Sequence, residues 1–156
     1  MRDKLNRIQA LLKKIKDEKK EKPLISEDSA MNEITKLLDY YDIDIEALQM
    51  TEDTKVAGER ILDALIKYYR WGKLKNEKDE KSFKVIQTLR NGKTITYSEV
   101  TAMKKRTMDS LEKTENYGKI HTFMGAMANI DLDGVDQLHA TDLAVLEVLG
   151  NVFLLI

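Results

Sequence analysis

Histidine catalysis in this chain would depend on His121 or His139, because these are the only two histidines among the 156 residues. Each lies among apolar neighbours, with no serine motif and no pair of acids beside it that would complete a catalytic set. Cysteine is absent, which excludes thiol catalysis, disulfides and thiolate zinc sites. The histidines are therefore expected to have structural or surface roles, and we expect no catalytic residue and no enzyme activity.

Three neighbouring aspartates, Asp131, Asp133 and Asp136, have a spacing that suggests a calcium-binding loop. An EF-hand loop would also need an oxygen ligand at position 135, glycine at position 136 and a bidentate glutamate at position 142. The chain has none of these residues there. The aspartates are therefore expected to cap helices and to interact with helix dipoles, and we expect no metal and no cofactor.

The segment Asn91-Gly92-Lys93-Thr94 ends like a phosphate-binding loop but lacks the glycines that precede one. Its flanks alternate β-branched residues with other side chains, a pattern typical of strands. Because Asn-Gly supplies the two positive φ angles of a type I′ turn, the segment predicts a two-stranded antiparallel hairpin. The expected cross-strand pairs are Arg90 with Lys93, Thr88 with Ile95, and Ile86 with Tyr97.

Apolar residues at helical spacing predict helices on both sides of this hairpin. The fold class is therefore mainly α with one antiparallel β-hairpin, an α+β arrangement with a helical N-terminal half and three or four helices after the hairpin. The expected organisation is a basic amphipathic helix (1–22), a helical subdomain (23–75), a charged connector (76–82) and a hairpin-plus-helices subdomain (83–156).

The overall composition, 42% apolar and 34% charged residues, is that of a globular protein and not of a disordered polyanion or a membrane protein. No secretory signal is expected, because the first residues form no continuous apolar stretch. The most apolar run, Leu143–Ile156, is too short to cross a bilayer and is interrupted by Glu147 and Asn151. We expect a buried helix there, no membrane partner and a cytoplasmic location.

The first predicted helix has an apolar seam at Leu5, Ile8, Leu12 and Ile15. Two heptads are fewer than a coiled coil needs, so the seam is expected to dock on the protein body or on a second copy. The rest of this helix is basic, because residues 1–22 contain nine Lys or Arg and four acids. The lysines that would contact nucleic acid are Lys13, Lys14, Lys16, Lys19 and Lys20.

The helix that ends near Gly72 carries an aromatic cluster, Tyr68, Tyr69 and Trp71. The first expectation for a stripe of this kind is that it packs into the core. Large aromatic side chains are also frequent in protein interfaces and on surfaces that stack nucleic-acid bases. Both partner-binding interpretations are therefore kept for these three residues.

The order of elements in residues 83–153 resembles the small tail assembly chaperones of tailed bacteriophages. The matching segments are Val85–Ile95 (the hairpin), Tyr97–Thr101 (the residues that lead into the helices), Met127–Asp131 (a helix end before an acidic turn) and Gln137–Leu146 (a leucine, an aspartate and a final apolar helix). The resemblance covers just under half of the chain, and the first 82 residues have no counterpart in it.

The resemblance implies a protein of a bacterial host cell that performs no chemistry and binds newly made tail components such as the tape measure protein. Such binding needs an accessible apolar groove, for which adaptable methionine side chains are well suited. The residues expected to form the groove are Met103, Met108, Phe123, Met124 and Met127. The alternative is that the methionines fill a core.

A different interpretation is a nucleic-acid-associated or regulatory helical protein of phage origin, which would use the basic first helix and the aromatic cluster. Its binding to DNA or RNA would weaken steeply as salt rises from about 50 to 200 mM. Self-association is also expected, through the N-terminal seam or through an edge of the hairpin, because an isolated hairpin is only marginally stable in water.

Overall fold

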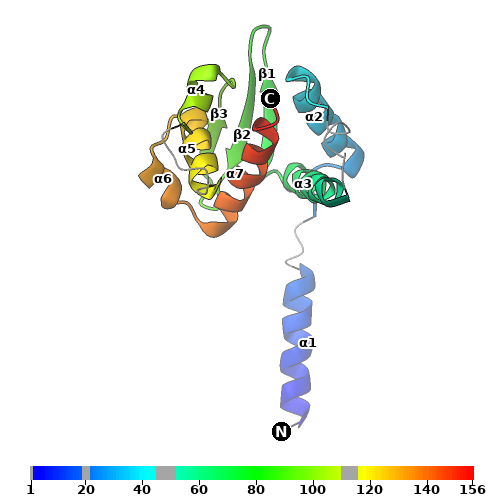
Figure 1. Ribbon diagram of the computed structural model, residues 1–156. Helices are drawn as coiled ribbons and strands as arrows, with labels where there is room; N and C mark the ends of the chain where they lie inside the picture. Colours follow the sequence, from blue (N-terminus) through cyan, green and yellow to red (C-terminus); the bar gives the residue numbers. More distant parts are fainter. Residues whose placement is uncertain (1, 19–21, 45–51, 110–115) are drawn as a thin grey trace.

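A computed structural model describes residues 2–18, 22–44, 52–109 and 116–156 (Figure 1). In chain order the elements are α1 (Arg2–Glu18), α2 (Glu27–Tyr40), α3 (Glu52–Arg70), β1 (Leu74–Lys78), β2 (Phe83–Thr88), β3 (Thr94–Tyr97), α4 (Ala102–Arg106), α5 (Asn116–Ala128), α6 (Leu132–Asp136) and α7 (Ala140–Phe153). The α+β class predicted from the sequence is confirmed, and four helices follow the sheet in the described part of the chain.

The sheet has three antiparallel strands in the order β1-β2-β3, one more than the sequence predicts. β1 pairs with β2 along its whole length. The predicted connector at 76–82 is therefore wrong, because residues 76–78 complete β1 and a turn at Asp79 leads into β2. In this turn Asp79 Oδ1 accepts a hydrogen bond from the backbone N–H of Ser82 at 2.8 Å. Strand β1 was not predicted from the sequence, because Leu74 is its one apolar residue and a single apolar residue shows no alternating pattern.

The register of β2 and β3 differs by one residue from the predicted register. Thr88 lies opposite Thr94, and Gln87 lies opposite Ile95. The predicted pairs of Thr88 with Ile95, Ile86 with Tyr97 and Arg90 with Lys93 are therefore wrong. Because a shift of one residue changes which side chains share a face of the sheet, the register decides which residues enter the core together.

The turn between the two strands explains the register. Leu89 N–H donates to the carbonyl of Lys93 at 2.8 Å, and Leu89 C=O accepts from Gly92 N–H at 2.9 Å, so the loop contains three residues. Gly92 has a positive φ of 84°, whereas Asn91 keeps a negative φ. This geometry is a type I turn followed by a glycine bulge, which needs one residue with positive φ where a type I′ turn needs two.

Two glycines allow the backbone requirement at the turn to be tested. A methyl group at Gly92 or at Gly58, in the middle of α3, would meet no atom within 4 Å, so the two sites differ in backbone conformation and not in space. Gly92→Ala should destabilise the protein by about 1 kcal/mol, because alanine is strained at positive φ. Gly58→Ala should stabilise it by about 0.5 kcal/mol, because glycine is unfavourable inside a helix. Urea denaturation of both variants checks this pair, and equal effects would contradict the turn geometry.

One face of the sheet packs against the helices. Alternate strand residues point to this face and are buried, namely Leu74, Phe83, Val85, Gln87, Ile95 and Tyr97. Figure 1 shows α7 in front of the sheet, with α5 on one side and α3 and α2 on the other. The buried residues of all these elements form one cluster. The predicted subdomains 23–75 and 83–156 therefore share a single core.

Helices α5 and α7 pack closely together at Gly150. A Cβ atom on Gly150 would lie 2.7 Å from Ile120 Cγ2 and 3.0 Å from Met124 Cγ, so a larger residue would force these side chains apart. Gly125 on α5 also lies at a close contact, because a Cβ atom there would lie 2.7 Å from Ile130 O and 3.3 Å from Val135 Cγ2 on α6.

Short polar side chains begin several helices. Thr101 Oγ1 accepts a hydrogen bond from Lys104 N–H at the start of α4, and Asp131 Oδ1 accepts one from Gly134 N–H at 2.8 Å at the start of α6. The role predicted for Asp131 as a helix cap is therefore confirmed. No helix among the described residues has both the length and the apolar character that a membrane span requires.

Candidate functional site

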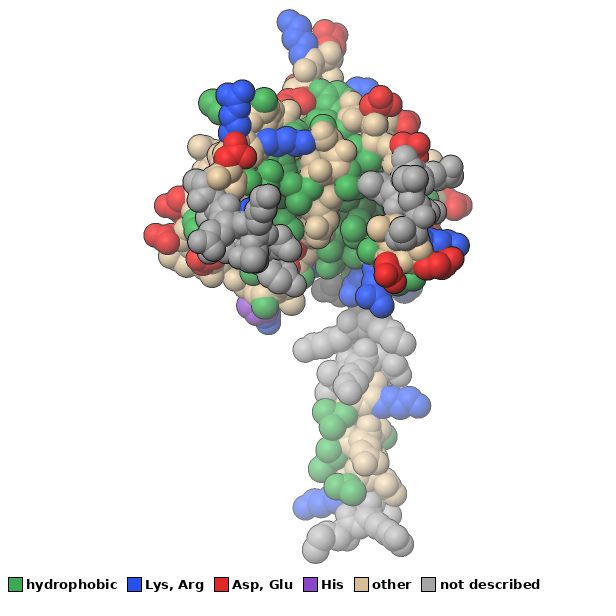
Figure 2. All heavy atoms as spheres, viewed as in Figure 1, with side chains coloured by type: hydrophobic (Ala, Val, Ile, Leu, Met, Phe, Trp, Pro, Cys, Tyr) green, Lys and Arg blue, Asp and Glu red, His purple; other side chains and the backbone are tan. Residues whose placement is uncertain are grey.

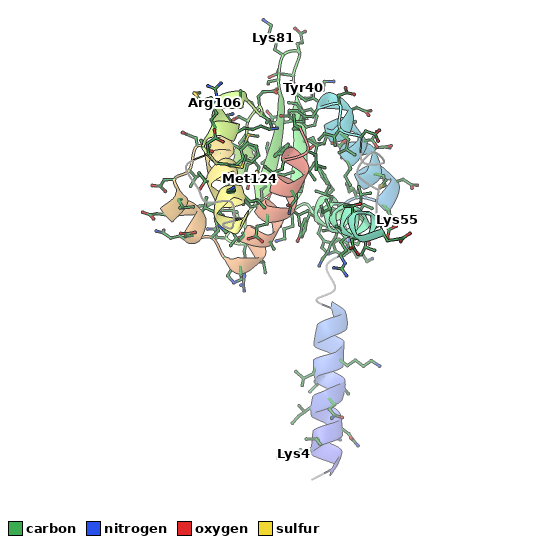
Figure 3. The ribbon with its side chains drawn as sticks, viewed as in Figure 1. Lys4, Tyr40, Lys55, Lys81, Arg106 and Met124 are labelled. Carbon is green, nitrogen blue, oxygen red and sulfur yellow. The ribbon has the colours of Figure 1, made fainter. Side chains whose placement is uncertain are left out.

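The residues predicted to form a methionine groove do not lie together on the surface. Phe123, Met124 and Met127 are buried, with at most 1% of each exposed, where α5 packs against α7 and β3. Met103 is 75% exposed on α4, and Met108 is partly buried. The groove prediction is therefore wrong for the three α5 residues, because their side chains fill the core (Figure 3, Met124).

The aromatic cluster at the end of α3 is divided between core and surface. Tyr69 is buried, and its hydroxyl donates a hydrogen bond to Asn76 Oδ1 at 2.6 Å. Burial raises the pKa of Tyr69, so its hydroxyl stays protonated and can keep donating this bond. Tyr68 is half-buried and Trp71 is 37% exposed. Tyr68 and Trp71 are accessible to a ligand, whereas Tyr69 is not.

A line of exposed apolar side chains runs along α1, at Leu5, Ile8, Leu11 and Leu12. Each of the four is more than half exposed, with fractions of 58, 51, 58 and 53%. We name these four residues the α1 stripe. Figure 2 shows apolar side chains gathered on one side of α1, which extends away from the rest of the protein. The side chain of Ile15, also predicted for this seam, lies outside the described residues.

The side chains beside the α1 stripe are basic. Lys4, Arg7 and Lys13 are exposed, and residues 4–13 contain no acid. Of the five lysines predicted for nucleic-acid contact, the side chain of Lys13 is described. Those of Lys14, Lys16, Lys19 and Lys20 lie outside the described residues.

A cleft of about 410 Å³ lies between the end of α3 and the start of α7. It is lined by Lys67, Tyr68, Trp71, Lys73, Arg90, Thr141, Asp142, Ala144 and Val145, and we name it the α3–α7 cleft. Its lining joins three separate stretches of sequence. Helical periodicity predicts a face of a helix but not which other elements lie beside it, so only the aromatic residues of this cleft could be found from the sequence.

Three cations line the α3–α7 cleft: Lys67, Lys73 and Arg90. Over the described part of the chain, none of the three has a carboxylate oxygen within 4.0 Å. The ion pairs found there join Lys36 to Glu33, Arg70 to Glu27 and His121 to Glu147. The positive charge at this cleft is therefore available to an anionic ligand.

Asp142 is the acidic residue in the lining of the cleft; it is 5% exposed, and its carboxylate forms hydrogen bonds within the protein. Its two carboxylate oxygens accept hydrogen bonds from the backbone N–H of Arg90 at 3.0 and 3.2 Å. The guanidinium of Arg90 contacts His139, with Nη1 of Arg90 2.7 Å from Nε2 of His139. Because a guanidinium can only donate, Nε2 of His139 must accept this bond.

Each histidine lies within hydrogen-bonding distance of a polar side chain. His139 also lies 2.8 Å from Thr141 Oγ1, but its other ring nitrogen faces Arg90, where a catalytic triad would need a carboxylate. His121 Nε2 lies 2.8 Å from Glu147 Oε1 in a half-buried pair. Within the described ranges no group of three or more His, Asp or Glu could hold a metal ion. Two accessible features stand out among the described residues: the α1 stripe and the α3–α7 cleft.

Comparisons with models of protein families, with curated proteins and with solved structures find no match.

Proposed function

We propose that the protein is a non-enzymatic binding protein that holds an apolar helical segment of another polypeptide against α1. The observation that carries this proposal is the α1 stripe, in which four aliphatic side chains of one helix are each more than half exposed. Exposed large aliphatic side chains occur singly on most surfaces, but a contiguous line of them marks a contact site. The binding mode would be that of two amphipathic helices packed along their apolar faces.

The charges beside the stripe indicate the chemistry of the partner. Residues 4–13 carry Lys4, Arg7 and Lys13 and no acid, so two copies of α1 packed together would bring like charges close to each other. A helix with acids beside its apolar face would instead place opposite charges together. We therefore expect a hetero-partner with acidic flanks in preference to a second copy of this chain.

The resemblance of residues 83–153 to phage tail assembly chaperones gives this partner a more specific form. In that case the partner is a newly made tail component, the tape measure protein, whose apolar helices need protection before the tail tube polymerises. The site differs from the one expected from the resemblance, because the methionines of α5 are buried and the exposed apolar surface lies on α1.

The proposal is tested by titrating the full chain with acidic amphipathic helical segments of a phage tape measure protein, using isothermal titration calorimetry. Leu12→Asp should weaken binding by about 30-fold, because a leucine buried in an interface contributes about 2 kcal/mol. Asn6→Asp is the matched control, since it adds the same charge to the same helix outside the stripe. Its affinity should change by less than about threefold.

Two results would contradict the proposal. The first is that no acidic helical segment binds. The second is that sedimentation finds a dimer of this chain that Leu12→Asp dissociates, because the α1 stripe would then be occupied by a second copy.

A further inference from the structure

The α3–α7 cleft combines two properties that polypeptide binding by α1 does not use. One wall contains the aromatic rings of Tyr68 and Trp71. Three cations, Lys67, Lys73 and Arg90, line the same cleft and have no carboxylate partner within 4.0 Å among the residues that the structure describes. An aromatic surface beside cations that have no carboxylate partner is a combination that can bind a planar base together with its phosphate.

We propose that the α3–α7 cleft binds a nucleotide unit, either as a free nucleotide or as one nucleotide of a single strand. The base would stack against Tyr68 and against the face of Trp71 opposite the Arg70 guanidinium, which lies 5.4 Å from the Trp71 ring centroid. The phosphate would pair with Lys67 and Lys73. The cleft volume of about 410 Å³ lies in the range of small-ligand sites, about 300–1,000 Å³. A site of this size holds one nucleotide and not a folded partner.

The distribution of exposure within the cleft sets the orientation of the ligand. Lys67 and Arg90 are exposed, whereas Val145 is buried. Asp142, which is 5% exposed and accepts hydrogen bonds from the backbone N–H of Arg90, would repel a phosphate placed on the buried side of the cleft. The phosphate is therefore expected at the exposed rim of the cleft, and the base on its apolar side.

An acidic peptide is the competing ligand for a basic cleft. Its carboxylates could pair with the lysines, but an aliphatic or acidic side chain would not use the stacking surface of Tyr68 and Trp71. The aromatic residues therefore favour a nucleotide over an acidic peptide as the ligand of the cleft.

Trp71 is the only tryptophan of the chain, so its fluorescence reports directly on the cleft. The full chain is titrated with adenosine 5′-monophosphate, with adenosine and with inorganic phosphate as separate probes. The monophosphate should quench Trp71 saturably, and each of the two fragments should bind about tenfold or more weakly, because each keeps only the stacking or only the charge contacts.

Lys67→Glu should weaken binding of the monophosphate by about tenfold, because it removes a charge-assisted contact. Lys55→Glu is the matched control, since it makes the same charge change at another exposed position of α3 that does not line the cleft (Figure 3). Both lysines are exposed, so neither variant should unfold the protein. Leu12→Asp should leave nucleotide binding unchanged, which separates this proposal from the one for α1.

The source of the nucleotide is distinguished by an oligodeoxyadenylate strand. A strand that binds more tightly than the monophosphate, with affinity falling steeply between about 50 and 200 mM salt, identifies single-stranded nucleic acid. A monophosphate that binds at least as tightly as the strand identifies a free nucleotide. The proposal is overturned if the monophosphate does not quench Trp71 at roughly 10 mM, far weaker than specific sites bind. Equal losses in Lys67→Glu and Lys55→Glu, or equally tight binding of polyglutamate, would overturn it as well.

Discussion

Replacing Met124 by aspartate should unfold the protein, whereas Met103→Asp should leave it folded. Met124 is fully buried and Met103 is 75% exposed, so the new carboxylate would lie in the core in one variant and in water in the other. A carboxylate placed in the core without a partner costs several kcal/mol, and losing a buried methionine side chain adds about 2–5 kcal/mol. Together these losses are comparable with the whole stability of a domain, about 5–15 kcal/mol.

The packing around Met124 leaves no route for the new charge to reach water. Its Cγ lies where a Cβ on Gly150 would approach to 3.0 Å, which places the side chain directly between α5 and α7. Thermal and urea denaturation followed by circular dichroism measure the difference between the two variants. A folded Met124→Asp protein with native stability would show that this methionine lies in an open groove, as the sequence pattern had suggested.

The second large effect is expected at Gln87, the buried centre of a polar network. Gln87 is completely buried; its Oε1 accepts a hydrogen bond from Tyr97 Oη at 2.6 Å, and its Nε2 donates to the carbonyl of Asp142 at 2.8 Å. Burial raises the pKa of Tyr97, so its hydroxyl remains a donor at neutral pH. The network joins the sheet to the start of α7 by side-chain hydrogen bonds.

Gln87→Ala should destabilise the protein by about 3–4 kcal/mol, because it leaves the Tyr97 hydroxyl without an acceptor and opens a cavity. Gln137→Ala removes the same side chain from an exposed position and should change the free energy of unfolding by less than about 0.5 kcal/mol. Urea denaturation checks both values.

Tyr97→Phe tests the same network from the other side. On its own it should cost about 1–2 kcal/mol, because Gln87 Oε1 loses its donor. In the double variant the two losses should not add, because the second substitution removes a bond that is already broken. Strictly additive losses would mean that the two residues act independently, contrary to the observed geometry.

Most helices and the hairpin could be predicted because their signals are local. The cap at Thr101 depends on a side chain and a backbone group three residues apart. The register of the hairpin could not be predicted, because Asn-Gly fits both a type I′ turn and the three-residue loop that the chain adopts. Strand β1 was missed because its sequence offers one apolar residue, and its pairing with β2 supplies the rest of its stability.

The candidate site was harder to predict than the fold. A methionine-rich helix face shows that a surface is apolar but not whether another element covers it, and α7 and β3 cover α5. Three of the four residues of the α1 stripe, Leu5, Ile8 and Leu12, were predicted from the sequence. Apolar residues at helical spacing mark one face of a helix whether that face is buried or exposed. The α3–α7 cleft depends on tertiary packing that brings Arg90 and Thr141 to the end of α3, and no local pattern contains that information.

The proposal that α1 is the recognition element is tested most directly by amide hydrogen exchange of the full chain, with and without an acidic helical segment of a phage tape measure protein. An unpartnered helix of this length is only marginally stable in water, so α1 should exchange quickly in the free protein. Addition of the segment should slow exchange in residues 4–13 and leave α5 unchanged. Protection that appears in α5 while α1 continues to exchange quickly would contradict the proposal.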